Sequence, residues 1–173
     1  MRPAALAAYR ERVTDMQIEV RDIRVDDAGE VMTLQRAAFV SEAQIYGSAD
    51  MPPLTQTLDE VKWELQDGNV GCVALTGERM VGALRARIDG DLLLVGRIAI
   101  APDMQGHGIG SLLLDAVEER GARAGAREAE LFTGSLSEAN LRLYERQGYR
   151  ETERVEEEGG TQQVFMRKPI AQA

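Results

Sequence analysis

The sequence predicts a single α/β domain with a mixed, mostly antiparallel sheet, one parallel pair of strands and about four flanking helices. The chain has 173 residues, 44% of them hydrophobic, which suffices for one compact domain with a buried core. Apolar runs between residues 70 and 100 are separated by short turns, which favour antiparallel strands. A glycine-rich segment then leads into an amphipathic helix and another strand, the pattern of a parallel β-α-β unit.

The first half of the chain is expected to place a strand and two helices around a long loop. Residues 17–25 alternate well enough for a strand, and residues 26–40 have the apolar spacing of a helix. The segment 41–57 contains a glycine, two prolines and little periodicity, so we expect a long loop of the kind that is often functional. A helix over 58–68 follows, in which we expect Trp63 to belong to the core.

The second half is expected to add strands on both sides of two helices. An antiparallel meander, a helix that starts near Gly108, a strand, a further helix and a closing hairpin follow one another. Apart from the helix at Gly108, these elements are expected over residues 70–76, 80–88, 92–100, 127–134, 137–148, 149–157 and 162–168. The acidic run at 151–158 is interpreted as the solvated face of a strand near a sheet edge.

Charge and composition exclude several classes of function. The chain has 20 basic and 29 acidic residues and a net charge of −9, which repels nucleic acid and anionic membranes and favours cationic small molecules. Cys72 is the only cysteine and lies in an apolar run, so we expect a buried, unreactive thiol. With a single histidine as well, we expect no metal site.

The chain ends and the hydropathy bear on location and domains. The N-terminal apolar stretch is broken by charges at residues 10–12 and makes a poor signal peptide. No stretch reaches the roughly 18 apolar residues of a membrane span, so we expect a cytoplasmic protein. We expect residues 1–15 to be an N-terminal extension and residues 16–170 to form one domain.

The glycine-rich segment has the properties of an anion site. Three glycines, Gly106, Gly108 and Gly110, alternate at the start of the amphipathic helix, where backbone N–H groups have no helical partner. The missing β-carbons let a large anion approach, and no acidic residue occupies the positive end of the helix. A glycine-rich turn without a ligand is the alternative. The Walker pattern and the dinucleotide fingerprint are both absent.

Two motifs together resemble a known superfamily. Q-x-x-G-x-G is present from Gln105 to Gly110, and N-x-x-x-Y-x-x-x-G-Y runs from Asn140 to Tyr149. In this order and at this distance they are similar to the GNAT superfamily of acyl-coenzyme A dependent N-acyltransferases. The order of elements from residue 17 to 168 also matches the fold of that family.

The resemblance implies an acetyl-coenzyme A site in a cleft where two parallel strands splay apart. Pantetheine is expected along Ile98, Ala99 and Ile100, where one N–H would stabilise the oxyanion. Asn140 would bind the pantetheine arm, and Tyr144, one turn later, would act as the catalytic acid near the sulfur. The pyrophosphate is expected on the loop residues Gln105, Gly106, His107, Gly108, Ile109, Gly110 and Ser111.

The general base departs from the family pattern. Many relatives have a glutamate in the strand before the glycine loop, and residues 92–100 have none. A bound water or one of three carboxylates, Glu42, Asp50 or Glu130, remains open for this role, whereas His107 is not favoured. Tyr46 is expected to shape the acceptor pocket with Met51 and Leu54, while Glu42 or Asp50 attracts a cation.

The resulting hypothesis is an N-acetyltransferase. It would transfer an acetyl group from acetyl-coenzyme A to a primary amine of a small molecule or peptide by direct attack on the thioester. The expected partners are an amine-bearing, small and potentially cationic acceptor, with no nucleic acid and no membrane, and a homodimer is compatible with this hypothesis. The alternatives are a non-catalytic acyl-coenzyme A binding or sensing protein on the same fold and a glycine-loop protein for another nucleotide.

Overall fold

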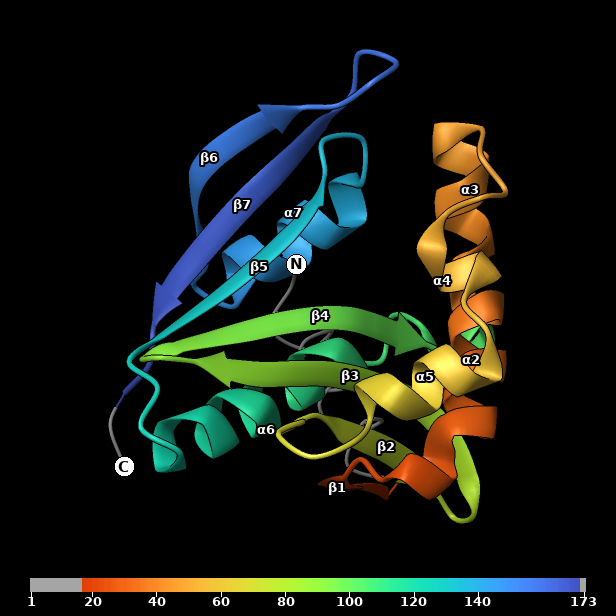
Figure 1. Ribbon diagram of the computed structural model, residues 1–173, viewed down its shortest axis with the longest axis vertical. Helices are drawn as coiled ribbons and strands as arrows, with labels where there is room; N and C mark the ends of the chain where they lie inside the picture. The colour runs from red at the N-terminus through yellow and green to blue at the C-terminus, as the bar shows by residue number, and fades with distance from the viewer. Residues whose placement is uncertain (1–16, 172–173) are drawn as a thin grey trace, which may run out of the picture.

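The computed structural model, which describes residues 17–171, contains one twisted sheet of seven strands (Figure 1). The strands lie in the order β1-β2-β3-β4-β5-β7-β6, and all neighbours are antiparallel except β4 and β5. Their bounds are β1 Ile18–Asp22, β2 Cys72–Thr76, β3 Arg79–Asp89, β4 Leu92–Ile100, β5 Glu128–Gly134, β6 Arg150–Glu156 and β7 Gln162–Pro169. The expected mixed sheet with one parallel pair is confirmed. The expected N-terminal extension, residues 1–15, lies outside the described residues.

Helices cover both faces of the β1–β4 half of the sheet. One face carries α6, and the other carries α2 and α5 (Figure 1). The α-helices are α2 Ala28–Ala38, α3 Val40–Tyr46, α4 Pro52–Thr55, α5 Leu58–Glu64, α6 Ile109–Arg123 and α7 Glu138–Arg146, with 3-10 turns at η1 Val25–Asp27 and η2 Pro102–Met104. In the β5–β7 half, α7 lies on one side and the strands close the fold as a hairpin.

The main core lies between α6 and strands β2–β4. Ile109, Leu113 and Val117 recur at helical spacing and are fully buried, and each contributes about 1.5 to 3 kcal/mol by leaving water. Gly82 of β3 makes the close approach possible, because a β-carbon there would lie 3.0 Å from Ile109 Cγ2 and Leu113 Cδ1. The spacing seen in the sequence therefore identifies the packing face of α6 correctly.

Two local expectations were wrong. The segment 41–57 is not one long loop, because α3 and α4 occupy most of it. No residue of α3 is buried, so its sequence has no apolar stripe, and the prolines that suggested a loop begin α4 instead. Trp63 is 73% exposed rather than part of the core. In α5, the buried side is formed by Val61 and by Leu65 at the end of the helix, four residues apart. Trp63 lies between them in the sequence and so points to another side of the helix.

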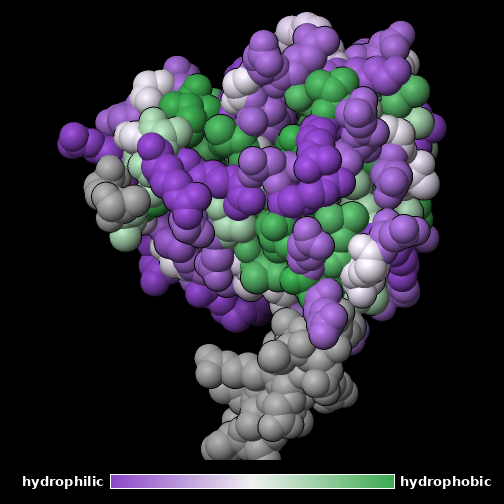
Figure 2. Space-filling view, turned by 90° about the horizontal axis from the view of Figure 1, so that it is seen from below, coloured by the Kyte–Doolittle hydropathy of each residue, from purple (hydrophilic) through white to green (hydrophobic). Residues whose placement is uncertain are grey.

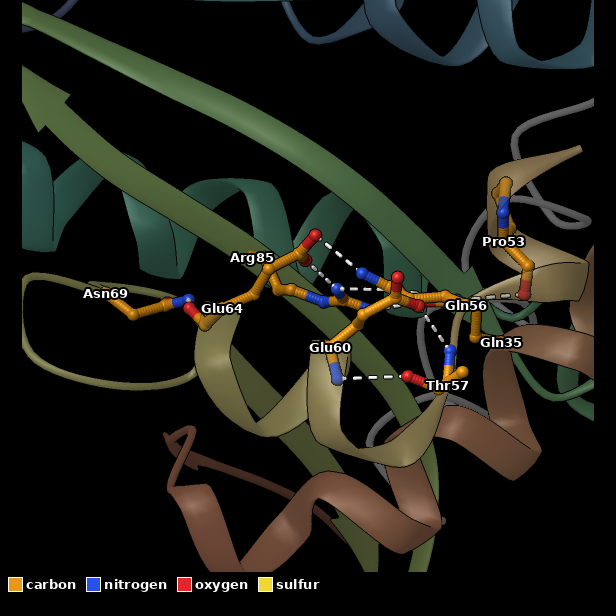
Figure 3. A network of polar contacts seen from close by, with 8 residues as sticks. All are labelled: Gln35, Pro53, Gln56, Thr57, Glu60, Glu64, Asn69 and Arg85. Carbon is orange, nitrogen blue, oxygen red and sulfur yellow. Dashed lines mark hydrogen bonds and ion pairs between the residues drawn. The ribbon is translucent and has the colours of Figure 1, made fainter.

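A buried arginine joins three helices to the centre of the sheet (Figure 3). Arg85 of β3 is 5% exposed and donates hydrogen bonds to Glu64 of α5 and Gln35 of α2. Gln35 Nε2 donates to the carbonyl of Pro53 in α4 at 2.8 Å, and Gln56 Nε2 donates to Glu64 at 2.6 Å. Burial lowers the pKa of Arg85, while the charge of Glu64 opposes that shift. The network therefore holds α2, α4 and α5 in register with β3.

The outer surface does not form a continuous hydrophobic layer. Seen from below, hydrophilic side chains cross the face and separate the hydrophobic ones into patches (Figure 2). Within residues 17–171, no helix is both long and apolar enough to cross a membrane.

Removing the carboxylate of the Arg85 network is expected to destabilise the fold. The Glu64→Ala change should lower the free energy of unfolding by about 2 kcal/mol, because it leaves a buried guanidinium without its counter-charge. Urea denaturation monitored by circular dichroism measures this loss. The matched control is Asp103→Ala, which removes the partner of Arg79 from a solvent-exposed pair and should change stability little. Equal losses in both variants would contradict the structural role of the network.

Candidate active site

The two parallel strands separate part-way along their length. Within residues 17–171, β4 and β5 are paired only over Leu92–Leu94 and Glu128–Glu130, and they diverge beyond this point (Figure 1). Further along, β5 is paired with β7 on its other side, whereas the β5-facing edge of β4 has no strand partner in the described chain. Main-chain groups on such an edge need hydrogen-bond partners. The Ile100 carbonyl accepts from Gln105 Nε2 at 3.4 Å, and the edge over residues 98–100 is open to an extended ligand in place of a strand.

A β-bulge in β4 lies at the start of this split. Gly96 pairs with Arg85 and Ala99 pairs with Ala83, so β4 has one more residue than β3 between these two pairs. Arg97 lies in this stretch and has a φ of +53°, in the left-handed region. Because a bulge bends its strand and increases the local twist, this one redirects β4 just beyond the point where its pairing with β5 ends.

The glycine-rich segment forms the turn that begins α6. Gly106 and Gly108 have φ values of +79° and +81°, which glycine adopts without steric cost. The helix has no acidic residue in its first turn and no side chain capping its N-terminus. Its first N–H groups and the positive end of its dipole are therefore available to an anion. Gly110 permits close packing, because a β-carbon there would lie 3.2 Å from Leu143 of α7.

Two predicted cofactor residues lie on α7, beside the split. Asn140 Nδ2 donates to Thr133 Oγ1 of β5 at 3.4 Å. Tyr144 is 6% exposed, and its ring packs edge-on against Tyr149 with 6.2 Å between the ring centroids. Burial, reinforced by the negative charge of Glu42, raises the pKa of the Tyr144 hydroxyl. This hydroxyl is therefore protonated at neutral pH and can act as a donor.

A chain of hydrogen bonds ties α3 to the segment between β5 and α7. Ser137 Oγ donates to Glu42 at 2.6 Å, because a carboxylate accepts. Tyr46 therefore donates its hydroxyl to Ser137 Oγ at 2.7 Å, and the same hydroxyl accepts from the Leu136 N–H at 3.1 Å. Gly134 is required beneath this contact, since a β-carbon there would lie 1.9 Å from the Tyr46 hydroxyl oxygen. The structure thus brings Glu42 and Tyr46 to the β5–α7 segment.

Sequence reasoning missed Ser137. Its position just before a helix is typical of an N-cap residue, which is a sufficient structural explanation for a serine. In the structure its side chain makes no cap hydrogen bond and instead contacts α3, 95 residues away along the chain. Only the long-range contact with Glu42 distinguishes this role of Ser137 from that of an N-cap residue.

The other candidate acids and bases lie apart from this chain of hydrogen bonds. Glu130 accepts from Arg167 Nε at 2.7 Å and is held in that ion pair. Asp50 is exposed in the segment between α3 and α4, and its N–H donates to Ser48 Oγ at 3.3 Å. His107 is half-buried in the glycine turn. Of the three carboxylates considered as bases, Glu42 is the one whose charge acts on Tyr144.

The thiol and the metal-ligating residues form no site in the described chain. Cys72 is buried in β2, with its Sγ 3.7 Å from the Leu113 carbonyl, and burial raises its pKa to about 11. It therefore stays protonated at neutral pH and is a poor nucleophile. Over residues 17–171, no three His, Cys, Asp or Glu side chains gather as metal ligands would.

A cavity of about 1020 Å³ lies on the sheet face that carries α5, at the point where β4 and β5 part. No sequence pattern predicts this cavity, because its walls come from α5, the loop after α5, and four strands. Its lining includes Trp63, Glu64, Arg85, Arg97, Glu130, Phe132 and Phe165. The cavity therefore opens beside the split, while Tyr144 lies on α7 outside the cavity lining.

Comparison with known proteins identifies the family. The model of the Acetyltransferase (GNAT) family matches residues 30–149, which include both motifs as far as Tyr149. The chain therefore belongs to the GNAT acetyltransferase family. None of the curated proteins that were compared matches it.

Solved structures show the same fold at low sequence identity. The ribosomal-protein-S18-alanine N-acetyltransferase of Escherichia coli has a TM-score of 0.75 at 16% identity, with 91% of this chain and 96% of that one covered. The PaiA N-acetyltransferase of Thermoplasma acidophilum, solved with coenzyme A, also has a TM-score of 0.75 at 16% identity, with coverage of 89% and 99%. YncA of Salmonella typhimurium, a putative acetyltransferase solved with acetyl-coenzyme A, has a TM-score of 0.70 at 18% identity, with coverage of 90% and 95%.

Family membership confirms the class of reaction and the donor. The protein is an acyltransferase, and acetyl-coenzyme A is the cofactor, as the two motifs indicated. The individual cofactor contacts expected from the sequence, including those of Gln105, Ser111 and Asn140, remain predictions.

The glycine turn can be tested by adding a charge to it. The Gly108→Asp change places a β-carbon and a carboxylate at the N-terminus of α6, so it should weaken coenzyme A binding about tenfold or more by repelling the phosphates. Isothermal titration calorimetry measures the dissociation constant.

The control for this variant is Gly90→Asp. Gly90 also has a positive φ, +62°, but lies in the β3–β4 turn with open space around its missing β-carbon. It carries the same backbone strain and the same added charge, so its affinity for coenzyme A should match that of the parent. Equal affinity in Gly108→Asp would place the phosphates elsewhere.

Proposed function

We infer that this protein transfers the acetyl group of acetyl-coenzyme A to the primary amine of a small molecule or peptide, by direct attack of the amine on the thioester. The observation that carries this proposal is the position of Tyr144. Its hydroxyl is buried on α7, and this burial, together with the charge of Glu42, raises its pKa. It lies beside the split, where the β5-facing edge of β4 has no strand partner beyond Leu94. A proton donor and a proton acceptor are thus available at one site.

The chain offers separate groups for each part of the cofactor. The N–H groups at the start of α6 and the turn at Gly106 and Gly108 suit the pyrophosphate. The unpaired edge of β4 over 98–100 suits the pantetheine arm, and an N–H near the bulge would stabilise the negative charge that develops on the carbonyl oxygen. When bound, acetyl-coenzyme A supplies an activated acyl group.

Two side chains account for the proton transfers. Glu42 takes the proton that the amine loses as the N–C bond forms, and Tyr144 supplies a proton to the sulfur as the C–S bond breaks. The raised pKa keeps the Tyr144 hydroxyl protonated at neutral pH, so it can donate a hydrogen bond to the sulfur as charge develops there, but it also makes the hydroxyl a weaker acid than an ordinary phenol. Ser137 and Tyr46 hold Glu42 through the chain of hydrogen bonds and are positioning residues.

A thiol-release assay with acetyl-coenzyme A tests this function directly. The panel should include polyamines, aminoglycosides, free amino acids and peptide N-termini. Amine-dependent release of coenzyme A supports the proposal. Tight binding of acetyl-coenzyme A with no turnover across the panel would instead favour the non-catalytic binding protein. At about 100 times its dissociation constant, the cofactor should stabilise the fold by about 2.7 kcal/mol, well above the effect of NADH or ATP.

The Tyr144→Phe change should lower turnover by roughly 10² to 10⁴-fold while leaving cofactor affinity nearly unchanged, because it deletes a donor whose interaction strengthens only as the sulfur leaves. Steady-state kinetics and calorimetry separate the two effects.

Tyr149→Phe is the matched control. The Tyr149 ring packs against the Tyr144 ring, and its buried hydroxyl has no hydrogen-bond partner among residues 17–171. Its loss should leave turnover within a factor of about two of the parent. If Tyr144→Phe behaves the same way, Tyr144 is a packing residue and water protonates the sulfur.

A further inference from the structure

Arg97 is a half-buried cation with no partner in the described part of the chain. It lines the cavity beside the strand split, and over residues 17–171 its side chain makes no hydrogen bond and no ion pair. The positive charge of Arg97 repels that of Arg85 and helps to lower the pKa of Arg85. Arg85 also keeps a buried donor, its Nε–H, without an acceptor in the same region of the structure. The cavity wall thus presents the unpaired guanidinium of Arg97, whereas the Arg85 Nε–H is buried behind it.

The backbone at Arg97 is unfavourable for an arginine. A φ of +53° costs a residue with a β-carbon about 1 kcal/mol or more, a cost that glycine avoids. Arg97 immediately follows Gly96 at the bulge, so the chain has a long cationic side chain where a second glycine would fit the backbone better. A strained residue at a cleft is a reason to look for a function of its side chain.

The remaining charges of the cavity are largely compensated. Arg85 is paired with Glu64, and Glu130 is paired with Arg167. Arg87 and Asp67, of opposite sign, are exposed. The lining has three arginines and three carboxylates, and Arg97 is the half-buried arginine whose side chain has no acidic partner within residues 17–171. A ligand with a single negative charge would pair with Arg97, whereas a polyamine would bring further positive charges close to it.

The apolar part of the cavity is aromatic. The rings of Phe132 and Phe165, on neighbouring strands, lie 5.4 Å apart, and Phe132 is 56% exposed. Trp63, which is also exposed, lines the cavity from α5. Such surfaces suit an apolar group that would leave water on binding.

We propose that the acceptor is an amino acid with an apolar side chain, whose carboxylate is bound by Arg97 and whose side chain lies against Phe132, Phe165 and Trp63. This proposal rests on the function inferred above and specifies its substrate class. A planar guanidinium binds a carboxylate through paired N–H donors and so fixes its orientation. Because Arg97 is on the bulge at the split, an amine one carbon from that carboxylate is held at the unpaired edge of β4.

The experiment compares acceptors that differ only in the carboxylate. For the parent protein, kcat/KM for L-phenylalanine and L-leucine should exceed that for phenethylamine and 3-methylbutylamine by about 10- to 100-fold, mainly through KM, the range expected for a charge-assisted hydrogen bond. In the Arg97→Gly variant, which relieves the backbone strain and should fold, this preference should disappear while activity on the two amines persists. Arg97→Lys should retain part of it.

The control for these variants is Arg142→Gln. Arg142 is an exposed arginine on α7, outside the cavity lining, and its loss should leave the preference unchanged. If the parent acetylates the amines as well as the amino acids, or if Arg97→Gly keeps the preference, the carboxylate site is wrong even though the acetyltransferase function stands.

A binding measurement separates this proposal from the proposed function. Calorimetry with N-acetyl-L-phenylalanine and with its amide, on protein saturated with coenzyme A, needs no turnover. Preference for the acid that is lost in Arg97→Gly supports the carboxylate site even if no amine is acetylated. Equal binding or absence of binding for both compounds, in a protein that acetylates other amines, overturns it.

Discussion

Two parallel strands that pair over three residues and then separate leave a strand edge without a strand partner inside a seven-stranded sheet. Such an edge is a site for another extended chain, whether a strand or a ligand that imitates one. The bulge at Arg97 lies where the separation begins. The glycine turn, the donors of α7 and the aromatic cavity are all arranged around this gap, so each part of the candidate site depends on the strands remaining apart.

The strands on either side of the split, β4 and β5, are each fixed by other interactions. On one side, Arg85 links α2, α4 and α5 to β3 through a buried polar network (Figure 3). On the other side, β5 is paired along its length with β7. The chain of hydrogen bonds from Glu42 through Ser137 joins α3 to the β5–α7 segment. Breaking a buried network of this kind costs more than a surface pair, because its remaining members stay away from water.

The electrostatics differ between the whole molecule and its clefts. The net charge of −9 favours cationic molecules at long range. Each of the two places that we assign to ligands instead has a local positive group, the N-terminus of α6 in one and Arg97 in the other. At contact distance, local groups outweigh the net charge, because water and salt screen the more distant ones. An acidic protein can therefore hold an anionic cofactor and a carboxylate.

The sequence alone determined the order of the seven strands and of α2, α5, α6 and α7, the packing face of α6, the glycine turn and the family, because these depend on periodicity and on motifs of neighbouring residues. It also placed Asn140 and Tyr144 on one helix. It did not reveal α3, because an exposed helix has no apolar stripe, and it misplaced Trp63. The role of Ser137, the burial of Arg85 and the cavity with its free Arg97 were decided by the tertiary structure alone. The residues that these side chains contact lie tens of residues away along the chain. A local sequence pattern does not predict which distant side chains come together when the chain folds.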